Sequence, residues 1–341
     1  MIGNKNISNM RILIVSGHQY PARIDGKASD RIGDCLAQGL AELGHRVFYQ
    51  LPYPAAAPLP DGVEVIHKRR FDVDVMWIND LMPLKPPFTR GIPWLTTLHA
   101  PQRMHGGTNP DVRDNWIFVS KAHAASFGSK RFVHNGVDPA EFIYSEAKDD
   151  YFLFAVADLE DLEIKGFETA RALVRECGIR LVVAGAISNP ESAERYKRMF
   201  AQEGITYVGH VSGERKAELF ARARALLFPT RANESFGLVI AEALISGTPV
   251  ICSNRGACPE LVSARVGYLC STFGDYVSSL RRLDLISPLA CRVFALERYH
   301  YLRMARDYLG EFQQEIVHWR SRWSRWLNFD HCGRHFAVGI P

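Results

Sequence analysis

Short apolar runs alternate along the chain with longer stretches in which apolar residues recur at helical spacing. Residues 11–17 (RILIVSG) are apolar and rich in β-branched side chains, which predicts a buried strand. Residues 31–47 place Ile32 and Leu40 on one helical face, and Gly44 is a suitable stop for that helix. Other apolar runs in this half predict strands from His45 onward and at 73–78, 92–99, 115–120 and 130–135.

The second half of the chain repeats this alternation. Its apolar runs predict strands at 151–157, 179–185, 205–211, 223–229 and 248–253. The segments between them predict helices at 166–178, 190–203, 213–223 and 237–246. Strands that alternate with helices form parallel sheets covered on both faces. We therefore expect an α/β protein of two Rossmann-like domains, residues 1–140 and 141–299, joined around residues 135–150.

Composition agrees with this picture and narrows the class of protein. A chain of 341 residues suggests two domains at roughly 150 residues each. The hydrophobic share of 47% and the charged share of 23% are typical of globular proteins. The net charge of +4 is too small to indicate a nucleic-acid partner. Seven dispersed cysteines, without a CxxC pair or zinc spacing, indicate reduced thiols.

The sequence also bears on where the protein works. The first ten residues, MIGNKNISNM, are polar and lack the apolar core of a signal peptide. No apolar run reaches the length of about 18 residues that spans a bilayer. We therefore expect a cytoplasmic protein.

The sharpest segment is residues 233–250 (NESFGLVIAEALISGTPV), which follows the strand that ends at Pro229. In parallel sheets, ligands bind beyond the carboxyl ends of the strands. Gly237 opens the predicted helix, where unpaired amides and a partial positive charge attract an anion and glycine permits close approach. These features predict a phosphate site. Glu234 and Glu242 flank it and suit the hydroxyls of a sugar and a ribose.

This acidic pair and its surroundings, ESFGLVIAEALISGTPVI, resemble the E-x7-E motif of the retaining family-4 glycosyltransferases almost residue for residue. The resemblance is close over about 150–270 and looser over 11–140 and 288–317. It implies a GT-B fold, a nucleotide-diphosphate sugar as donor, and attack by an acceptor hydroxyl assisted by the leaving phosphate. It implies neither a metal nor a cofactor, since the nucleotide sugar is a substrate.

The resemblance also assigns roles within the segment. Glu234 would bind hydroxyls of the donor sugar, and Glu242 would bind the ribose. The backbone amides that would hold the diphosphate and sugar are those of Phe236, Gly237, Leu238 and Val239.

A cation for the leaving diphosphate is implied at Lys165, in the loop after the strand at 151–157. The family places an arginine before that lysine, in Gly-Arg-Leu, where this chain has Asp158. One cation is therefore missing, and Arg231 or Arg255 could replace it. The alternative for Lys165 is a solvated surface lysine.

Three further positions resemble donor-site residues of the family. His99 stands at the end of a predicted strand, where the family has a histidine that contacts the donor sugar, although a structural histidine is the alternative. Gly26 is what remains of the Gly-Gly pair usual in the loop at 16–28, with Lys27 beside it. Gly185 ends a strand and would let the backbone approach the nucleotide, although a turn glycine is an equal explanation.

Other motifs carry less chemistry. Residues 135–138 (NGVD) resemble the family's linker, and Ser120 with Lys121 resembles its usual strand end. Asp72 and Asp74 form a DxD pair like the metal motif of another glycosyltransferase fold. We reject a metal site there because the acids begin a predicted strand and the other motifs need no metal. No other cluster has metal-ligand spacing.

The C-terminal region predicts helix from about 287 to 317, with Tyr301, Met304, Ala305, Tyr308 and Phe312 spaced as a buried face. The resemblance implies that a final helix, about 300–330, returns to pack on the N-terminal domain. Trp319, Trp323 and Trp326 share a helical face among arginines. Such a pattern suits either a membrane interface or packing, and we favour packing. The basic run at 68–70 leaves peripheral membrane contact open as well.

The leading hypothesis is a retaining glycosyltransferase whose acceptor is a saccharide, a lipid-linked molecule or a small molecule. A GT-B hydrolase or epimerase of sugar nucleotides is one alternative. A degenerate protein that binds a nucleotide sugar without turnover is another, kept open by the missing arginine and the reduced Gly-Gly pair. A dehydrogenase is the weakest, because the chain has no GxGxxG fingerprint.

Overall fold

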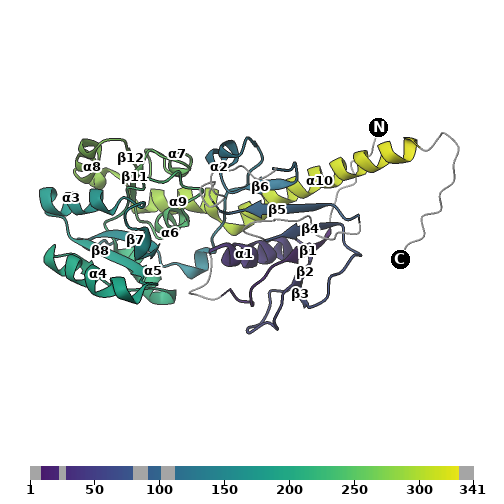
Figure 1. Cartoon of the computed structure of the whole chain (residues 1–341), viewed down its shortest axis with the longest axis horizontal. Helices are drawn as coiled ribbons and strands as arrows, with labels where there is room; N and C mark the ends of the chain where they lie inside the picture. Colours follow the sequence, from purple (N-terminus) through teal and green to yellow (C-terminus); the bar gives the residue numbers. More distant parts are fainter. Residues whose placement is uncertain (1–8, 23–27, 80–90, 101–111, 330–341) are drawn as a thin grey trace.

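The computed structural model describes residues 9–22, 28–79, 91–100 and 112–329, and the side chains of 322–329 are outside that description. Within these residues the chain forms two six-stranded parallel sheets. Figure 1 shows them side by side along the long axis of the molecule. The expected α/β fold with two parallel sheets is confirmed, while the domain limits at residues 140 and 299 stay a prediction.

The N-terminal sheet is built around its first strand. Its order is β3-β2-β1-β4-β5-β6. The strands are β1 (Arg11–Val15), β2 (Arg46–Gln50), β3 (Val63–Ile66), β4 (Val75–Ile78), β5 (Trp94–Leu98) and β6 (Trp116–Phe118). The helices are α1 (Ala28–Glu42) and α2 (Lys121–Ser126). All the recorded strand pairs of this sheet are parallel.

The C-terminal sheet repeats the same winding. Its order is β12-β11-β10-β7-β8-β9. The strands are β7 (Phe152–Asp158), β8 (Leu181–Ala186), β9 (Thr206–Tyr207), β10 (Ala225–Phe228), β11 (Val250–Ser253) and β12 (Gly267–Cys270). In both sheets the strand order switches to the other side of the first strand after three strands, so the switch point lies between β1 and β4 and between β7 and β10. The crevice at such a switch point is where open parallel sheets bind ligands.

The helices of the C-terminal half cover both faces of this sheet. They are α3 (Phe167–Cys177), α4 (Pro190–Gln202), α5 (Gly213–Arg222), α6 (Leu238–Ile245), α7 (Cys258–Leu261), α8 (Phe273–Leu280) and α9 (Pro288–Tyr299). Short 3-10 turns lie at η2 (Pro139–Glu141), η3 (Leu159–Asp161) and η4 (Leu283–Leu285).

Several predicted elements differ from the structure. The strand predicted at 130–135 is reduced to one bridge between Phe132 and Phe118. The reason is that β6 ends at Phe118 and α2 begins at Lys121, so no further strand length is left to pair. Strands β3 and β12 were not expected; β12 includes a glycine and two residues that are not buried, which weakens any periodic signal.

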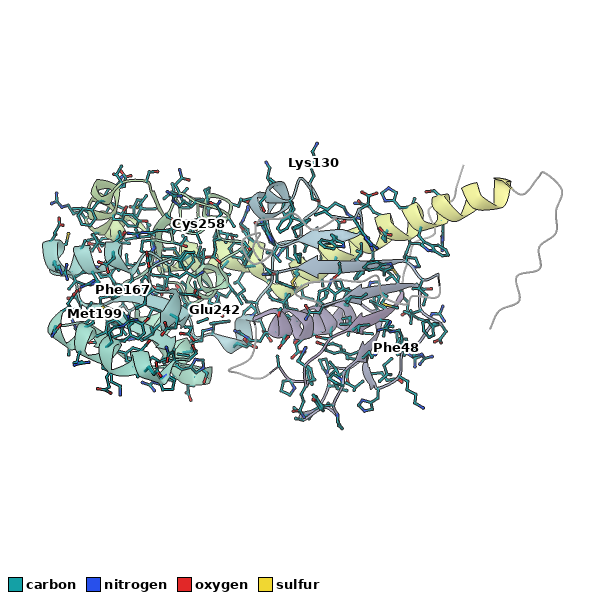
Figure 2. The ribbon with its side chains drawn as sticks, viewed as in Figure 1. Phe48, Lys130, Phe167, Met199, Glu242 and Cys258 are labelled. Carbon is teal, nitrogen blue, oxygen red and sulfur yellow. The ribbon has the colours of Figure 1, made fainter. Side chains whose placement is uncertain are left out.

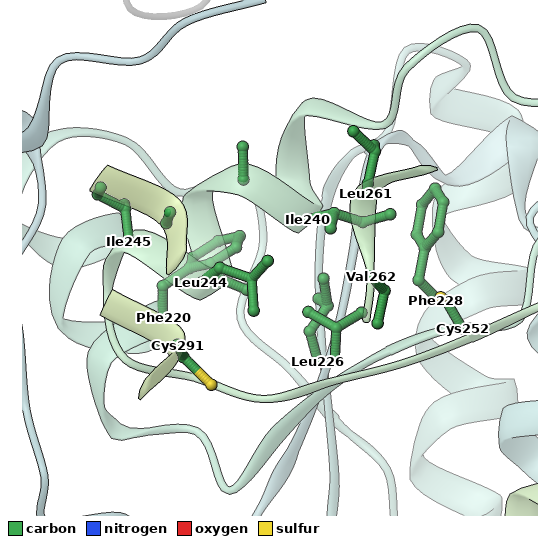
Figure 3. Packing of buried hydrophobic residues seen from close by; sticks show 14 of the residues in the cluster. Phe220, Leu226, Phe228, Ile240, Leu244, Ile245, Cys252, Leu261, Val262 and Cys291 are labelled. Atoms are coloured by element: carbon green, nitrogen blue, oxygen red, sulfur yellow. The ribbon is translucent and has the colours of Figure 1, made fainter. Parts of the chain in front are cut away.

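Helix α6 lies at the centre of one core. Its residues Ile240, Ala241, Ala243, Leu244 and Ile245 are all buried. Figure 3 shows Ile240, Leu244 and Ile245 packed with Leu226 of β10 and Leu261 of α7. A helix that is apolar on almost every side must be held within the core along most of its length. The position of its N-terminus is therefore fixed by the packing of the whole domain.

The last helix, α10 (Tyr301–Phe329), runs back along the N-terminal sheet (Figure 1). Tyr301, Met304, Ala305, Tyr308 and Phe312 are buried in one cluster with residues of β1, β2, β4 and α1. The helix predicted at 287–317 is divided at His300, because Val137 of the linker bonds to the backbone of Tyr299 and Tyr301. The side chains of Trp323 and Trp326 lie outside the described residues.

Close packing of α1 on α10 depends on Gly39. A Cβ added there would lie 2.8 Å from the Cβ of Ala305 and 3.2 Å from the carbonyl oxygen of Tyr301. Gly310, in the middle of α10, would meet nothing within 4 Å. Both glycines lie inside helices, so alanine brings each the same intrinsic gain of up to about 1 kcal/mol.

We expect Gly39→Ala to lower the free energy of unfolding by about 1–3 kcal/mol, because neither backbone nor a methyl group can move aside easily. Gly310→Ala is the matched control and should be neutral or stabilising. Urea denaturation of the two variants measures the difference. Equal stabilisation by both substitutions would contradict tight packing of α1 on α10.

Candidate functional site

The start of α6 is open to the cleft. Gly237 precedes the helix with a left-handed backbone (φ 87°), and no side chain caps the helix there. Gly237, Leu238 and Val239 are partly exposed, whereas Phe236 is buried. Unpaired amides at a helix start carry partial positive charge, so an anion can bind there.

Lys165 and Glu234 meet beside this helix start. Lys165 Nζ lies 2.6 Å from Glu234 Oε2 and 5.6 Å from the ring centre of Phe228. The two residues come from the loops after β7 and β10, the strands on either side of the switch point. The loop of Glu234 is held in turn by the amide of Ala257, which donates to its carbonyl oxygen at 3.0 Å. An acid and a cation therefore border the open helix start together.

In the loop after β7, Asp158 stands where the family pattern has an arginine. Asp158 accepts a hydrogen bond from the amide of Glu160 and caps the turn η3. Arg231 and Arg255 are both exposed in neighbouring loops. The amide of Arg231 donates to the carbonyl of Ile164, next to Lys165, at 2.9 Å. The backbones of these loops adjoin Lys165 and Glu234, so both arginines stay candidates for the second cation.

Glu242 lies deeper, one helical turn into α6, and is almost fully buried. Figure 2 labels it near the middle of the molecule, where the two domains meet. Lys216 of α5 donates to its Oε1 at 2.6 Å, and Arg31 of α1 donates to the same oxygen at 3.1 Å. Burial raises the pKa of Glu242, but the two cations lower it by more, so its pKa lies below the ordinary value.

A cavity of about 840 Å³ opens between the domains. It is lined by four predicted donor-site residues, Gly185, Leu238, Val239 and Glu242. Gly185 also has a packing role, because a Cβ there would lie 3.0 Å from the carbonyl oxygen of Val156. His99, Lys165, Glu234 and Gly237 are not among the lining residues. The predicted site thus divides into a cavity and the open helix start beside it.

His99 follows β5, and its Nε2 is buried without a hydrogen-bond partner among the described residues. Burial, with a smaller effect from nearby His123, lowers the pKa of His99 to about 4. His123 holds the same loop, because its Nε2 donates to the carbonyl of Ala100 at 3.1 Å. His99 is therefore a neutral imidazole at physiological pH.

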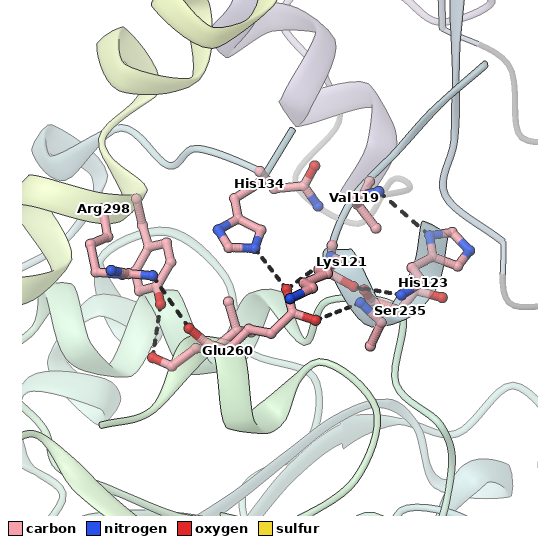
Figure 4. A network of polar contacts seen from close by, with 12 residues as sticks. Val119, Lys121, His123, His134, Ser235, Glu260 and Arg298 are labelled. Atoms are coloured by element: carbon pink, nitrogen blue, oxygen red, sulfur yellow. Dashed lines mark hydrogen bonds and ion pairs between the residues drawn. The ribbon is translucent and has the colours of Figure 1, made fainter. Parts of the chain in front are cut away.

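Hydrogen bonds at Glu260 and at Ser235, the residue after Glu234, join the two domains (Figure 4). Glu260 of α7 accepts hydrogen bonds from the amides of Lys121 and Ala122 at 2.8 and 2.5 Å, and from His134 Nε2 at 3.1 Å. Ser120 Oγ donates to the carbonyl of Ser235 at 2.6 Å. These contacts join α2 and the segment after it to α7 and to the loop that leads into α6.

Gly26 and Lys27 lie outside the described residues. The described part of their loop is held by Asp34, which accepts from the amide of Ala22 at 2.6 Å and from Tyr49 and His18, both at 2.9 Å. In the DxD pair, Asp72 forms an ion pair with Arg70. Asp74 pairs with Arg11. No group of three metal-ligating side chains gathers within the described residues.

Arg31, Lys216, Glu260 and His134 were not predicted as site residues. Each acts on a partner far away in the sequence, and the periodic patterns around them show only helices or strands. Arg31, for example, is 211 positions from Glu242.

The family model for "Glycosyl transferases group 1" matches residues 153–283. The O-antigen chain mannosyltransferase RfbU of Salmonella typhimurium is 27% identical over 40% of this chain and 38% of its own length. The MMP alpha-(1->4)-mannosyltransferase of Mycolicibacterium hassiacum is 31% identical over 53% of this chain and 47% of its own. The matches therefore span less than half of these two relatives.

Solved structures extend the likeness to the whole fold. AviGT4, a glycosyltransferase of avilamycin A biosynthesis, superposes with a TM-score of 0.73 at 23% identity over 90% of this chain and 98% of its own. Anabaena HepE, solved with UDP and glucose, has a TM-score of 0.64 at 14% identity over 90% of this chain and 100% of its own. Among the described helices, none has both the length and the apolar character needed to cross a bilayer. Residues 153–283 therefore match the glycosyl transferases group 1 family, within a chain that has the two-domain GT-B fold.

Proposed function

We propose that the protein is a retaining, metal-independent glycosyltransferase that moves a hexose from a nucleotide-diphosphate sugar to an acceptor hydroxyl. The observation that carries this proposal is the pairing of Lys165 with Glu234 beside the uncapped start of α6. Two relatives are named mannosyltransferases, which favours mannose as the sugar. The likeness to a structure solved with UDP and glucose supports a nucleotide sugar as donor.

In this proposal the donor lies across the helix start. The amides of Phe236, Gly237, Leu238 and Val239 and the ammonium of Lys165 hold the diphosphate. Glu234 leaves part of its pairing with Lys165 to accept from sugar hydroxyls. The ribose lies in the cavity at Glu242, and the base lies near Gly185.

The reaction breaks the bond between the anomeric carbon and the phosphate oxygen. The acceptor oxygen bonds to the same face of that carbon, and its proton passes to the leaving phosphate. Negative charge grows on the phosphate as the bond breaks, so fixed amide dipoles and Lys165 stabilise the transition state more than the ground state. His99 is too weak a base to take the proton and instead hydrogen-bonds the sugar.

A ligand screen and one variant test the proposal together. We expect at least one nucleotide-diphosphate hexose to raise the melting temperature, because a ligand of the folded state alone stabilises it. With that donor and a panel of saccharide, lipid-linked and small acceptors, Glu234→Ala should lower transfer by roughly 100-fold or more. The melting temperature without ligand should change little, since Glu234 is not in the core.

Glu176→Ala removes an exposed acid of α3 and is the matched control. NMR of the product should show the anomeric configuration of the donor. Wild-type turnover in Glu234→Ala would defeat the assignment of the site. Consumption of donor without acceptor indicates a hydrolase or epimerase instead, and tight binding without product indicates a degenerate binding protein.

The state of His99 predicts a pH effect on stability. The pKa of His99 is about 4 in the folded protein and about 6.5 in an unfolded chain. As pH falls below 6.5, the unfolded state takes up this proton first, so the stabilisation present above that pH is lost progressively towards pH 4. At pH 5 the loss from His99 alone is about 2 kcal/mol.

We therefore expect His99→Gln to lose less stability than wild type between pH 7 and pH 5, measured by urea denaturation at each pH. His318→Gln changes an exposed histidine of α10 and should follow wild type. Parallel curves for His99→Gln and wild type would contradict a neutral, buried imidazole.

A further inference from the structure

Arg31 reaches from the N-terminal domain into the C-terminal half of the cleft. It lies in the first turn of α1, and its Nη1 is 3.1 Å from Oε1 of Glu242. Its Nη2 pairs with Glu141 in the turn η2, between the domains. The side chain of Arg31 is 24% exposed and that of Glu242 is 2% exposed. A residue of the first domain thus contacts the most deeply buried acid of the second.

Glu242 would be costly to bury without such partners. A carboxylate removed from water needs opposite charge and hydrogen bonds to remain ionised. Lys216 supplies one of each from within the same domain. Arg31 supplies a second charge to the same oxygen, although one cation already neutralises the acid. Glu242 therefore does not need Arg31 to be neutralised, and the charge of Arg31 is matched by Glu141 at its other nitrogen.

The second oxygen of Glu242 is the free one. Among the described residues, none donates a hydrogen bond to Oε2. Arg31, Lys216 and Glu242 all line the cavity of about 840 Å³, together with Gly185 and Leu238. The cavity wall thus presents an acceptor oxygen beside two cationic donors. A hydroxyl both donates and accepts, so a pair of neighbouring hydroxyls matches this arrangement.

We propose that Arg31 is a nucleotide-binding residue contributed by the N-terminal domain. It orients Glu242 through Oε1 and donates to the ribose hydroxyls that bind Oε2. The nucleotide half of the donor then binds both domains, and its full affinity requires the closed cleft. The inference rests on the proposed function, because the ligand is a ribonucleotide part of the donor.

The outcome differs if the ion pair between Arg31 and Glu242 serves only to join the domains. In that case the loss of Arg31 weakens every nucleotide equally, through the position of the domains. If Arg31 acts on the ribose, its loss matters less for a nucleotide that lacks the 2′-hydroxyl. The two changes, in protein and in ligand, are then not additive.

The test is calorimetric binding of UDP and GDP and of their 2′-deoxy forms to the full chain. We expect Arg31→Met to weaken whichever ribonucleotide binds wild type by about tenfold or more, the loss typical of a hydrogen bond from a charged group. The same variant should weaken the 2′-deoxy nucleotide by less than about threefold. Arg31→Lys keeps the charge and should lose less than Arg31→Met.

Arg11→Met is the matched control, since Arg11 lies on β1 and pairs with exposed Asp74. Melting temperatures report folding, and Arg31→Lys carries the same comparison if Arg31→Met does not fold. Equal losses for both nucleotide forms, no loss at all, or a wild type indifferent to the 2′-hydroxyl would overturn the inference while leaving the proposed function intact. A wild type that binds neither UDP nor GDP, nor any nucleotide sugar of the screen, would overturn both.

Discussion

The uncapped N-terminus of α6 is the feature on which the rest of the site depends. Because the helix is apolar on almost every side, the C-terminal core fixes its axis, and its first amides must stand where the chain leaves β10. The left-handed backbone at Gly237 turns the chain into the helix without a side chain over those amides. Lys165 and Glu234 are then brought to the same point by the two strands at the switch. Packing in the C-terminal core thus fixes the open helix start in place.

The site also requires that the two domains keep a fixed position relative to one another. Glu260 and Ser120 join them behind the Glu234 loop, while α10 returns across the gap and packs on α1. Burial raises the pKa of Glu260, and the hydrogen bonds from His134 and two amides lower it by more. The Glu260 carboxylate that joins the domains is therefore charged at neutral pH. These contacts therefore hold the two domains together from outside the cavity.

Much of the fold follows from local patterns, because parallel strands and amphipathic helices have distinct periods. The E-x7-E segment could be placed from sequence for the same reason: a glycine before an apolar run predicts both a helix start and an anion site. Periodicity could not separate α9 from α10, because the break at His300 is made by the backbone of Val137, far away in the chain. Nor could it find Arg31, whose role depends on a contact between domains. Long-range partners are what local patterns leave out.

The chain lacks one cation of the family pattern at Asp158, but other cations lie around the cleft. Where Gly-Arg-Leu is usual, Asp158 uses its carboxylate to cap η3, which removes a cation and adds an anion in the loop of Lys165. Lys165 cannot offset both, because Glu234 already shares its charge. Arg231 and Arg255 border the same loops from the C-terminal domain, and Arg31 brings positive charge from the other side of the cleft. A site that relies on cations from several loops and from both domains gathers its full positive field only when the domains are closed. Under the proposed function, the domains must therefore stay together for the donor to bind and for the leaving phosphate to be stabilised.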